Sequence, residues 1–272
     1  MSSDTSNQAE LTNPSFWDQR WNSHNMGVIQ RGRSPVADAI LHFMDQYASQ
    51  YSTGSILEIG GAPGRYLARM AIDHDLSATA IDYSPEGCDQ LRANFAKLDR
   101  PITVIERNVL TEEPETTEKY DVVFSLGLIE HFEDVEEIIR SHVKYLKDGG
   151  ILILGVPNCL GIYRWFWKSL SPDLLSKHVL STMEADRWEH WAKRCGIRPV
   201  KIAHVGGFDS ASLDKREVSG FHWKKVLAKA LRLMFYRRWN LLGRTSHPAL
   251  SAYLIGAFQL DNQDSTSKKT HS

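Results

Sequence analysis

The sequence is poor in cysteine and has no long hydrophobic run. Its three cysteines, Cys88, Cys159 and Cys195, contain no pair at Cys-x-x-Cys spacing, which argues against a zinc ribbon or a redox dithiol. A sparse, odd set of cysteines favours a reducing compartment. The longest apolar run, Ile151–Val156, is far shorter than the ~20 residues that cross a bilayer. Residues 1–13 are polar and do not resemble a signal peptide, so we expect a cytoplasmic protein.

The sequence also lacks an excess of charge of either sign. Lys and Arg together number 32 and Asp and Glu 33, which gives a formal net charge of -1. Proteins that hold nucleic acid along their whole surface carry a large positive excess, so this class is not expected. The charge is nevertheless uneven, because residues 215–244 contain nine basic residues and one acidic residue. The rest of the chain is therefore acidic.

Short apolar runs recur along the chain and alternate with helix-like patterns. Such runs are typical of strands that are buried on both faces of a parallel sheet. The five runs are residues 55–59, 78–82, 102–105, 121–125 and 151–156. Residues 134–146 place apolar side chains three and four positions apart, which predicts a helix that Gly149 and Gly150 would end. Two later strands are expected at 200–205 and 252–260.

This alternation predicts one α/β domain over residues 14–260. Its fold would be doubly wound and Rossmann-like, with a mostly parallel seven-stranded sheet and helices on both faces. The polar ends, residues 1–13 and 261–272, are expected to be disordered.

Two aromatic and basic segments, residues 159–182 and 215–244, interrupt the pattern and are expected to form a helical cap insertion. In the second segment, basic residues share a predicted helix with an apolar, aromatic face, which suits an anionic membrane surface. A helix packed on the body with solvated Lys and Arg is an equal alternative.

A glycine-rich turn, residues 58–64 (EIGGAPG), follows the first predicted strand. Ligands of open α/β sheets bind at such turns. A P-loop would need Lys and Ser or Thr after the last glycine, whereas Gly64 is followed by Arg65 and Tyr66. The dinucleotide pattern G-x-G-x-x-G also fits poorly. Glu58 would repel a pyrophosphate but suits the cationic sulfonium and ammonium groups of S-adenosylmethionine (SAM).

A second acid, Asp82, stands at the end of the next predicted strand. A carboxylate there can accept hydrogen bonds from both hydroxyls of a ribose. The alternative is that Asp82 caps the helix that begins near Ser84 and Pro85. We favour the ribose role because the order of strand, glycine turn, helix, strand and acid is complete.

At this point the chain resembles the class I SAM-dependent methyltransferases of the small-molecule type. Five motifs match in order over residues 50–160, and each is weak alone. They are Glu58-x-Gly60-x-x-x-Gly64, Ile81-Asp82-Tyr83-Ser84, Asn108-Val109-Leu110, residues 120–132 (YDVVFSLGLIEHF), and Leu146-Lys147-Asp148-Gly149-Gly150 with Pro157-Asn158. Residues 16–21 (FWDQRW) also look like the N-terminal helix that covers the cofactor in many of these enzymes.

The resemblance implies a role for each matching residue. Glu58 and the turn would hold the methionine part of SAM, the turn through the backbone of Gly60, Gly61, Ala62 and Gly64. Asp82 would hold the ribose and Tyr83 would pack on the adenine. Asn108 and Val109 would face the adenine edge, and Ser125 and Leu126 would contact the methionine end through their backbone. The sequence departs from the usual motifs at Ala62, a glycine in the family, and at Asn108, an acid in the family.

Methyl transfer to a hydroxyl requires alignment of the reactants and removal of the hydroxyl proton. The candidates for the second task are Glu130 and His131, at the end of the fourth predicted strand. His131 is the natural base because imidazole titrates near neutrality. The alternative is that His131 only shapes the pocket. His178 is a weaker candidate, and no metal site is expected.

These observations predict a SAM-dependent methyltransferase that acts at oxygen on a small-molecule or lipid-linked acceptor. Residues 215–244 would give it peripheral contact with anionic membrane at the inner face. Nucleic acid is not an expected partner, because residues 125–128 (SLGL) replace the Asn-Pro-Pro-Tyr type of motif of base methyltransferases. Two alternatives stay open: a non-catalytic SAM-binding or scaffold protein and, more distantly, an NAD(P)-dependent oxidoreductase.

Overall fold

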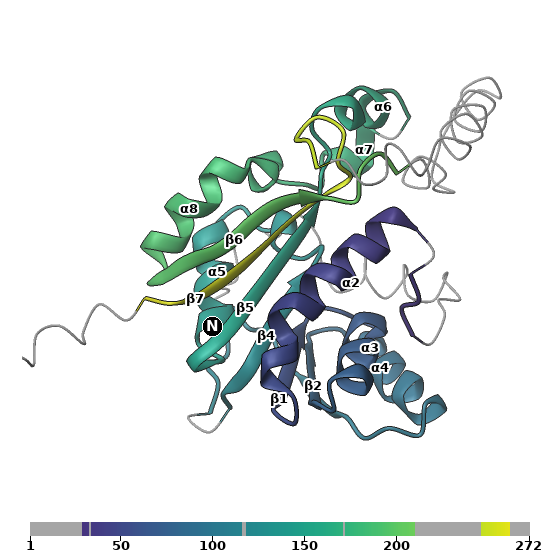
Figure 1. Cartoon of the computed structure of the whole chain (residues 1–272), viewed down its shortest axis with the longest axis vertical. Coiled ribbons are helices and arrows are strands. Elements are labelled where there is room, and N and C mark those ends of the chain that lie inside the picture. The colour runs from purple at the N-terminus through teal and green to yellow at the C-terminus, as the bar shows by residue number, and fades with distance from the viewer. Residues whose placement is uncertain (1–28, 33, 116–117, 171, 210–245, 262–272) are drawn as a thin grey trace, which may run out of the picture.

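A seven-stranded sheet forms the centre of the molecule (Figure 1). The structure is a computed structural model that describes residues 29–32, 34–115, 118–170, 172–209 and 246–261. The strands are β1 (Ser55–Ile59), β2 (Ser77–Asp82), β3 (Thr103–Glu106), β4 (Tyr120–Leu126), β5 (Leu146–Pro157), β6 (Ile197–Val205) and β7 (Tyr253–Leu260). Their order is β3-β2-β1-β4-β5-β7-β6, in which β7 alone runs antiparallel to its two neighbours. The predicted mostly parallel, seven-stranded α/β sheet is confirmed.

Helices cover both faces of the sheet (Figure 1). One face packs against α2 (Pro35–Ala48), α3 (Arg65–Asp73) and α4 (Pro85–Lys97), and the other against α5 (Val135–Val143) and α8 (Ala185–Arg194). Consecutive strand residues point to opposite faces of the sheet. Ile56 therefore packs in the core on the side of α2, α3 and α4, and Leu57 in the core on the side of α5 and α8. This two-sided burial explains why the strands are apolar without interruption.

The short helices α6 (Ile162–Leu170) and α7 (Pro172–Leu175) lie beyond the carboxyl ends of the parallel strands (Figure 1). They belong to the first segment of the predicted cap, residues 159–182. The second segment, residues 215–244, lies outside the described residues, as do residues 1–13, 16–21 and 262–272. Among the helices that the structure describes, none is long and apolar enough to cross a membrane.

One helix boundary differs from the prediction. Helix α5 starts after its cap, Asp134, and ends at Val143, well before Gly149 and Gly150. Those glycines instead lie inside β5, which begins at Leu146 because Leu146 already pairs with Tyr120 of β4. Gly149 and Gly150 therefore do not end the helix. The three cysteines are buried and form no disulfide.

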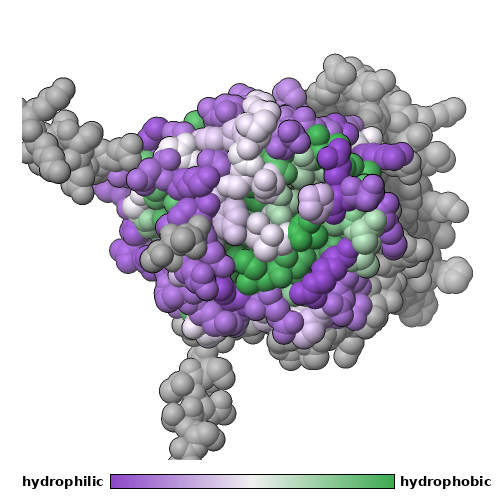
Figure 2. Space-filling view, turned by 90° about the horizontal axis from the view of Figure 1, so that it is seen from below, coloured by the Kyte–Doolittle hydropathy of each residue, from purple (hydrophilic) through white to green (hydrophobic). Residues whose placement is uncertain are grey.

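The surface seen from below gathers apolar residues in its centre, with hydrophilic residues around them (Figure 2). More than half of an ordinary protein surface is contributed by apolar atoms, so the patch by itself assigns no function.

The turn between β1 and α3 leaves no room for a side chain at Gly64. This residue caps α3 in the left-handed conformation, with φ of 75°. A Cβ atom here would lie 2.7 Å from Leu91 Cδ2. The turn is thus fixed by both backbone conformation and packing against α4.

We expect Gly64→Ala to destabilise the fold more than Gly149→Ala does. Both glycines have nearly the same φ, 75° and 76°, but no atom lies within 4 Å of a Cβ placed on Gly149. Gly149→Ala should cost the strain of a left-handed residue, ~1–2 kcal/mol. Gly64→Ala should cost ~1–3 kcal/mol more because its methyl group overlaps Leu91. Urea unfolding of both variants measures the difference, and equal losses would contradict the packing argument.

A second prediction concerns the pH dependence of stability and rests on His142 of α5. This side chain is fully buried, with Nδ1 2.7 Å from the Ile138 carbonyl oxygen and Nε2 2.9 Å from Ser125 Oγ. Burial lowers the pKa of His142 to about 4. In the unfolded chain this histidine takes up a proton near pH ~6.5, whereas in the folded protein it does so only near pH 4. The free energy of unfolding should therefore fall as the pH drops from ~6.5 toward about 4.

The test is urea unfolding between about pH 7 and about pH 5. His142→Leu should lower stability at every pH and flatten the slope by up to ~1.4 kcal/mol per pH unit, the contribution of one proton. His190→Leu, at an exposed position on α8, is the matched control and should keep the slope. Parallel curves for wild type and His142→Leu would refute the assignment.

Candidate active site

A pocket of about 510 Å³ opens at the carboxyl ends of β1, β2 and β3. Ligands of doubly wound sheets bind in this position. The pocket brings together five of the predicted cofactor residues: Gly60, Asp82, Tyr83, Asn108 and Val109. Ile59, Ile81, Arg107, Leu128, Phe132 and Ile138 complete its lining.

The lining is mostly apolar and carries a few polar groups, as is typical of sites for small molecules. Three lining residues were not predicted from the sequence: Arg107, which donates to Glu118 Oε2 at 2.6 Å, and the apolar residues Leu128 and Phe132. Arg107 directly precedes the predicted Asn108, and this position in the same loop could have indicated that Arg107 lines the pocket. Leu128 and Phe132 flank Glu130 and His131, and nothing in their residue types distinguishes them from core residues.

Asp82 lines the pocket and does not cap α4. The capping group is Ser84, whose Oγ accepts from the Gly87 amide at 2.9 Å. Asp82 Oδ1 accepts from the Ser84 amide at 3.0 Å and so supports the cap from two residues before it. A Cβ atom on Gly87 would lie 3.0 Å from the Asp82 carboxyl carbon, so α4 approaches this carboxylate closely.

Glu58 is buried at the end of β1, only 3% exposed, and its carboxylate packs against the turn. A Cβ atom on Gly61 would lie 2.0 Å from the Glu58 carboxyl carbon. Among the described residues, Glu58 Oε2 has no hydrogen-bond partner. Burial raises the pKa of Glu58 well above its usual value, and the nearby charge of Asp82 raises it further. A buried acid with an unmatched oxygen fits a cationic ligand group, such as the ammonium of SAM.

The other predicted cofactor residues do not line the pocket. Gly61, Ala62 and Gly64 form the turn beside it. Ser125 and Leu126 end β4, and the Ser125 hydroxyl is held by His142 inside the core. These five residues therefore lie next to the pocket without lining it.

Asn108, in contrast, lines the pocket, and its side chain is hydrogen-bonded within the loop after β3. Asn108 Oδ1 accepts from the Leu110 amide at 3.0 Å and so fixes the loop after β3. A carbonyl oxygen has two lone pairs, so this contact leaves room for a second donor.

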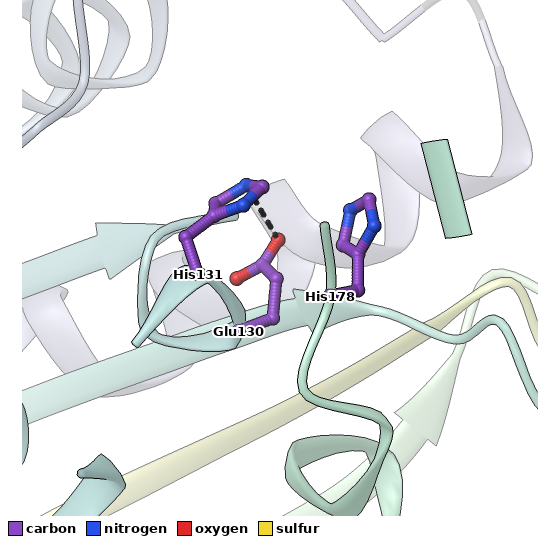
Figure 3. Close-up of side chains that lie close together, drawn as sticks. All are labelled: Glu130, His131 and His178. Atoms are coloured by element: carbon purple, nitrogen blue, oxygen red, sulfur yellow. Dashed lines mark ion pairs between the residues drawn. The ribbon is translucent and has the colours of Figure 1, made fainter. Parts of the chain in front are cut away.

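Glu130 and His131 lie on the single 3₁₀ turn η2 (Ile129–His131), just beyond β4. They are 1% and 6% exposed, and Glu130 Oε1 lies 3.9 Å from His131 Nε2. This is too long for a hydrogen bond but close enough for a charge interaction. Figure 3 shows the carboxylate and the His131 ring turned toward each other.

Two contacts from the segment after α7 fix this pair. His131 Nδ1 lies 2.9 Å from the Lys177 carbonyl oxygen, and the Val179 amide donates to the Glu130 carbonyl oxygen at 2.7 Å. Because a carbonyl oxygen can only accept, His131 Nδ1 carries the hydrogen. In neutral His131 the lone pair therefore resides on Nε2, on the side of Glu130.

His178 lies closer to this pair than the sequence indicated. Its ring centroid is 4.9 Å from that of His131, at an interplanar angle of 42°. His178 was the weaker candidate in the sequence, because a lone histidine in a lid segment is more often a surface residue. Only the path of the chain through α6 and α7 brings the two rings together.

Tyr253, at the start of β7, is a further residue that the sequence did not reveal. Burial, followed by the charges of Glu130, Tyr66 and Glu58, raises the pKa of Tyr253 well above its usual value. The phenol of Tyr253 thus lies within the electrostatic reach of both Glu58 and Glu130.

Comparison with known proteins agrees with this geometry. The family described as "Methyltransferase domain" matches residues 57–152, which include the glycine turn, β2, β3, β4 and parts of β1 and β5. A ubiquinone biosynthesis O-methyltransferase of Proteus mirabilis is 23% identical over 193 residues, which cover 70% of this chain and 73% of that protein. One of Rickettsia typhi is 28% identical over 139 residues, but the match spans only 51% of this chain and 55% of that protein.

A solved structure shares the fold over nearly its whole length. It is a SAM-dependent methyltransferase of Thiobacillus denitrificans in complex with S-adenosyl-L-homocysteine. The TM-score is 0.57 at 16% identity, and the match covers 91% of this chain and 99% of that chain. Together these findings favour the SAM interpretation over the dinucleotide alternative. The chain has the class I, Rossmann-like methyltransferase fold, and its residues 57–152 match the methyltransferase domain family.

Proposed function

We propose that this protein transfers the methyl group of SAM to a hydroxyl oxygen of a small-molecule or lipid-linked acceptor. The Proteus and Rickettsia relatives carry names that specify O-methyltransferases of ubiquinone biosynthesis, which supports oxygen as the methylated atom. The names of such distant relatives do not supply the acceptor. The lipid-linked alternative draws on the basic, aromatic segment 215–244 and remains a prediction from the sequence.

In this proposal the two acids of the pocket region hold opposite ends of SAM. Glu58 would bind the ammonium of the methionine part, supported by the backbone of Gly60, Gly61, Ala62 and Gly64. Asp82 would accept from the ribose hydroxyls. The adenine would lie against Tyr83, Asn108 and Val109, and the backbone of Ser125 and Leu126 would border the methionine end. When bound, SAM supplies a methyl group that is already activated by its attachment to a sulfonium.

The chain's own contribution to the chemistry would be to orient the acceptor and to help remove its hydroxyl proton. The observation that carries this is the fixed tautomer of His131, whose Nδ1 donates to the Lys177 carbonyl oxygen. In neutral His131 the Nε2 lone pair lies on the side of Glu130, and Glu130 Oε1 at 3.9 Å would stabilise the imidazolium that forms when Nε2 takes a proton. We propose Glu130 and His131 as this catalytic pair. Their burial would keep competing water away from the reacting atoms.

The first test is transfer of label from methyl-labelled SAM to small-molecule and lipid extracts, followed by NMR identification of the new methyl group. We expect labelled product with the methyl group on oxygen. His131→Ala should lower kcat by ~10²–10⁴-fold, the usual contribution of a general base.

The control is SAM binding, which His131→Ala should retain because His131 does not line the cofactor pocket. A loss of kcat below about tenfold would remove His131 as the essential base. If the wild-type chain binds SAM but labels no acceptor in any extract, the proposed methyl transfer is wrong and a scaffold role is favoured.

A second prediction concerns the pH dependence of SAM binding. Because the pKa of Glu58 is raised, protons compete with the SAM ammonium for this carboxylate at mildly acidic pH. SAM affinity should therefore rise with pH as Glu58 ionises. Glu58→Gln should weaken binding ~10- to 100-fold at higher pH, the equivalent of one lost charge-assisted hydrogen bond, and should flatten the rise.

Calorimetric titration at several pH values measures both effects. Glu189→Gln, at an exposed position on α8, controls for the loss of a carboxylate from the surface. It should change neither the affinity for SAM nor the pH dependence of that affinity. A Glu58→Gln protein that keeps the wild-type affinity and pH profile would show that Glu58 does not bind the cation.

A further inference from the structure

Glu130, His131 and His178 form a cluster with the composition of a metal site. Each offers one ligand atom, and the three atoms lie within 4.8 Å of one another. Two of the residues come from η2 and the third from the segment after α7, as Figure 3 shows. Ligand atoms ~2.1 Å from one tetrahedral zinc ion lie ~3.4 Å apart, so side-chain rotations that bring the three atoms closer together would complete the coordination.

The surroundings prepare this cluster in the way that metal sites require. A metal-binding imidazole usually donates its other N–H to a carbonyl or carboxylate, which fixes the tautomer. His131 does this through Nδ1 to the Lys177 carbonyl oxygen at 2.9 Å, so Nε2 presents its lone pair toward Glu130. The bond from the Val179 amide to the Glu130 carbonyl oxygen then anchors the segment that carries His178.

The donor set indicates which kind of ion fits. Two imidazoles and one carboxylate suit Zn²⁺ and similar first-row ions, whereas Mg²⁺ and Ca²⁺ prefer oxygen ligands alone. Three protein ligands leave a fourth position for water or an oxygen atom of another molecule, which is the arrangement of catalytic zinc sites.

We propose that Glu130, His131 and His178 bind one divalent transition-metal ion of the zinc class, with an open position directed to the acceptor. The use of this ion in catalysis rests on the proposed function, but its binding does not. The Nε2 lone pair of His131 cannot hold an ion and accept a proton at once. With the ion bound, the three residues would hold it in place, and its positive charge would lower the pKa of the acceptor hydroxyl.

The test uses the full chain without an affinity tag, freed of metal by a chelator and titrated with Co²⁺, whose visible absorption reports coordination. We expect one Co²⁺ per chain, displaced by Zn²⁺, and a thermal midpoint that rises with added Zn²⁺. His178→Phe should lower Co²⁺ affinity at least about tenfold. This variant keeps an aromatic ring beside His131, so a role in packing alone predicts no change in affinity.

Two further variants make the result specific. His178→Asp replaces one ligand by another and should restore part of the affinity that His178→Phe loses. His190→Phe, at an exposed position, should bind Co²⁺ as the wild type does. Absence of stoichiometric binding, or equal affinity of wild type and His178→Phe, would overturn the proposal.

Label transfer separates the metal site from the proposed function. A chain that binds no Co²⁺ but methylates an acceptor refutes the metal site and leaves the function standing. A chain that binds Co²⁺ at this site but transfers no methyl group refutes the function and supports the site.

Discussion

The buried carboxylate of Glu58 is the constraint around which the cofactor side of the molecule is arranged. It lies at the end of an apolar strand, and only a turn without a side chain at Gly61 can pass over it. Burying a carboxylate is costly, and its raised pKa expresses that cost. The parallel sheet then adds Asp82 at the same edge, because β1 and β2 end side by side. The fold thus concentrates negative charge where a ligand of doubly wound sheets binds.

The opposite side of the site depends on a different kind of contact. There, backbone groups of the segment after α7 meet η2, through Lys177 on His131 and Val179 on Glu130. The first bond orients the His131 ring, the second holds the backbone of Glu130, and the same segment brings His178 against His131. The result is a cluster of Glu130, His131 and His178 that joins segments distant in sequence through hydrogen bonds that secondary structure alone does not require.

This difference explains what could be predicted from the sequence. The strand runs, the glycine turn and Asp82 are local patterns, and the structure places them as expected, in a sheet of the predicted class. The end of α5 was wrong, because the pairing of Leu146 with Tyr120 draws the chain into β5 before the glycines. Tyr253 and the approach of His178 to His131 depend on contacts across the fold, which no local pattern contains. The roles of the individual residues remain predictions.

The distribution of charge connects these two sides. Glu58 and Glu130 both raise the pKa of Tyr253, so the acids of the two sides share one electrostatic environment. An environment of this sign would oppose the pyrophosphate of a dinucleotide and favour the ammonium and sulfonium of SAM. It would equally favour a divalent cation beside Glu130. The same field would therefore favour both a cationic cofactor and a metal ion.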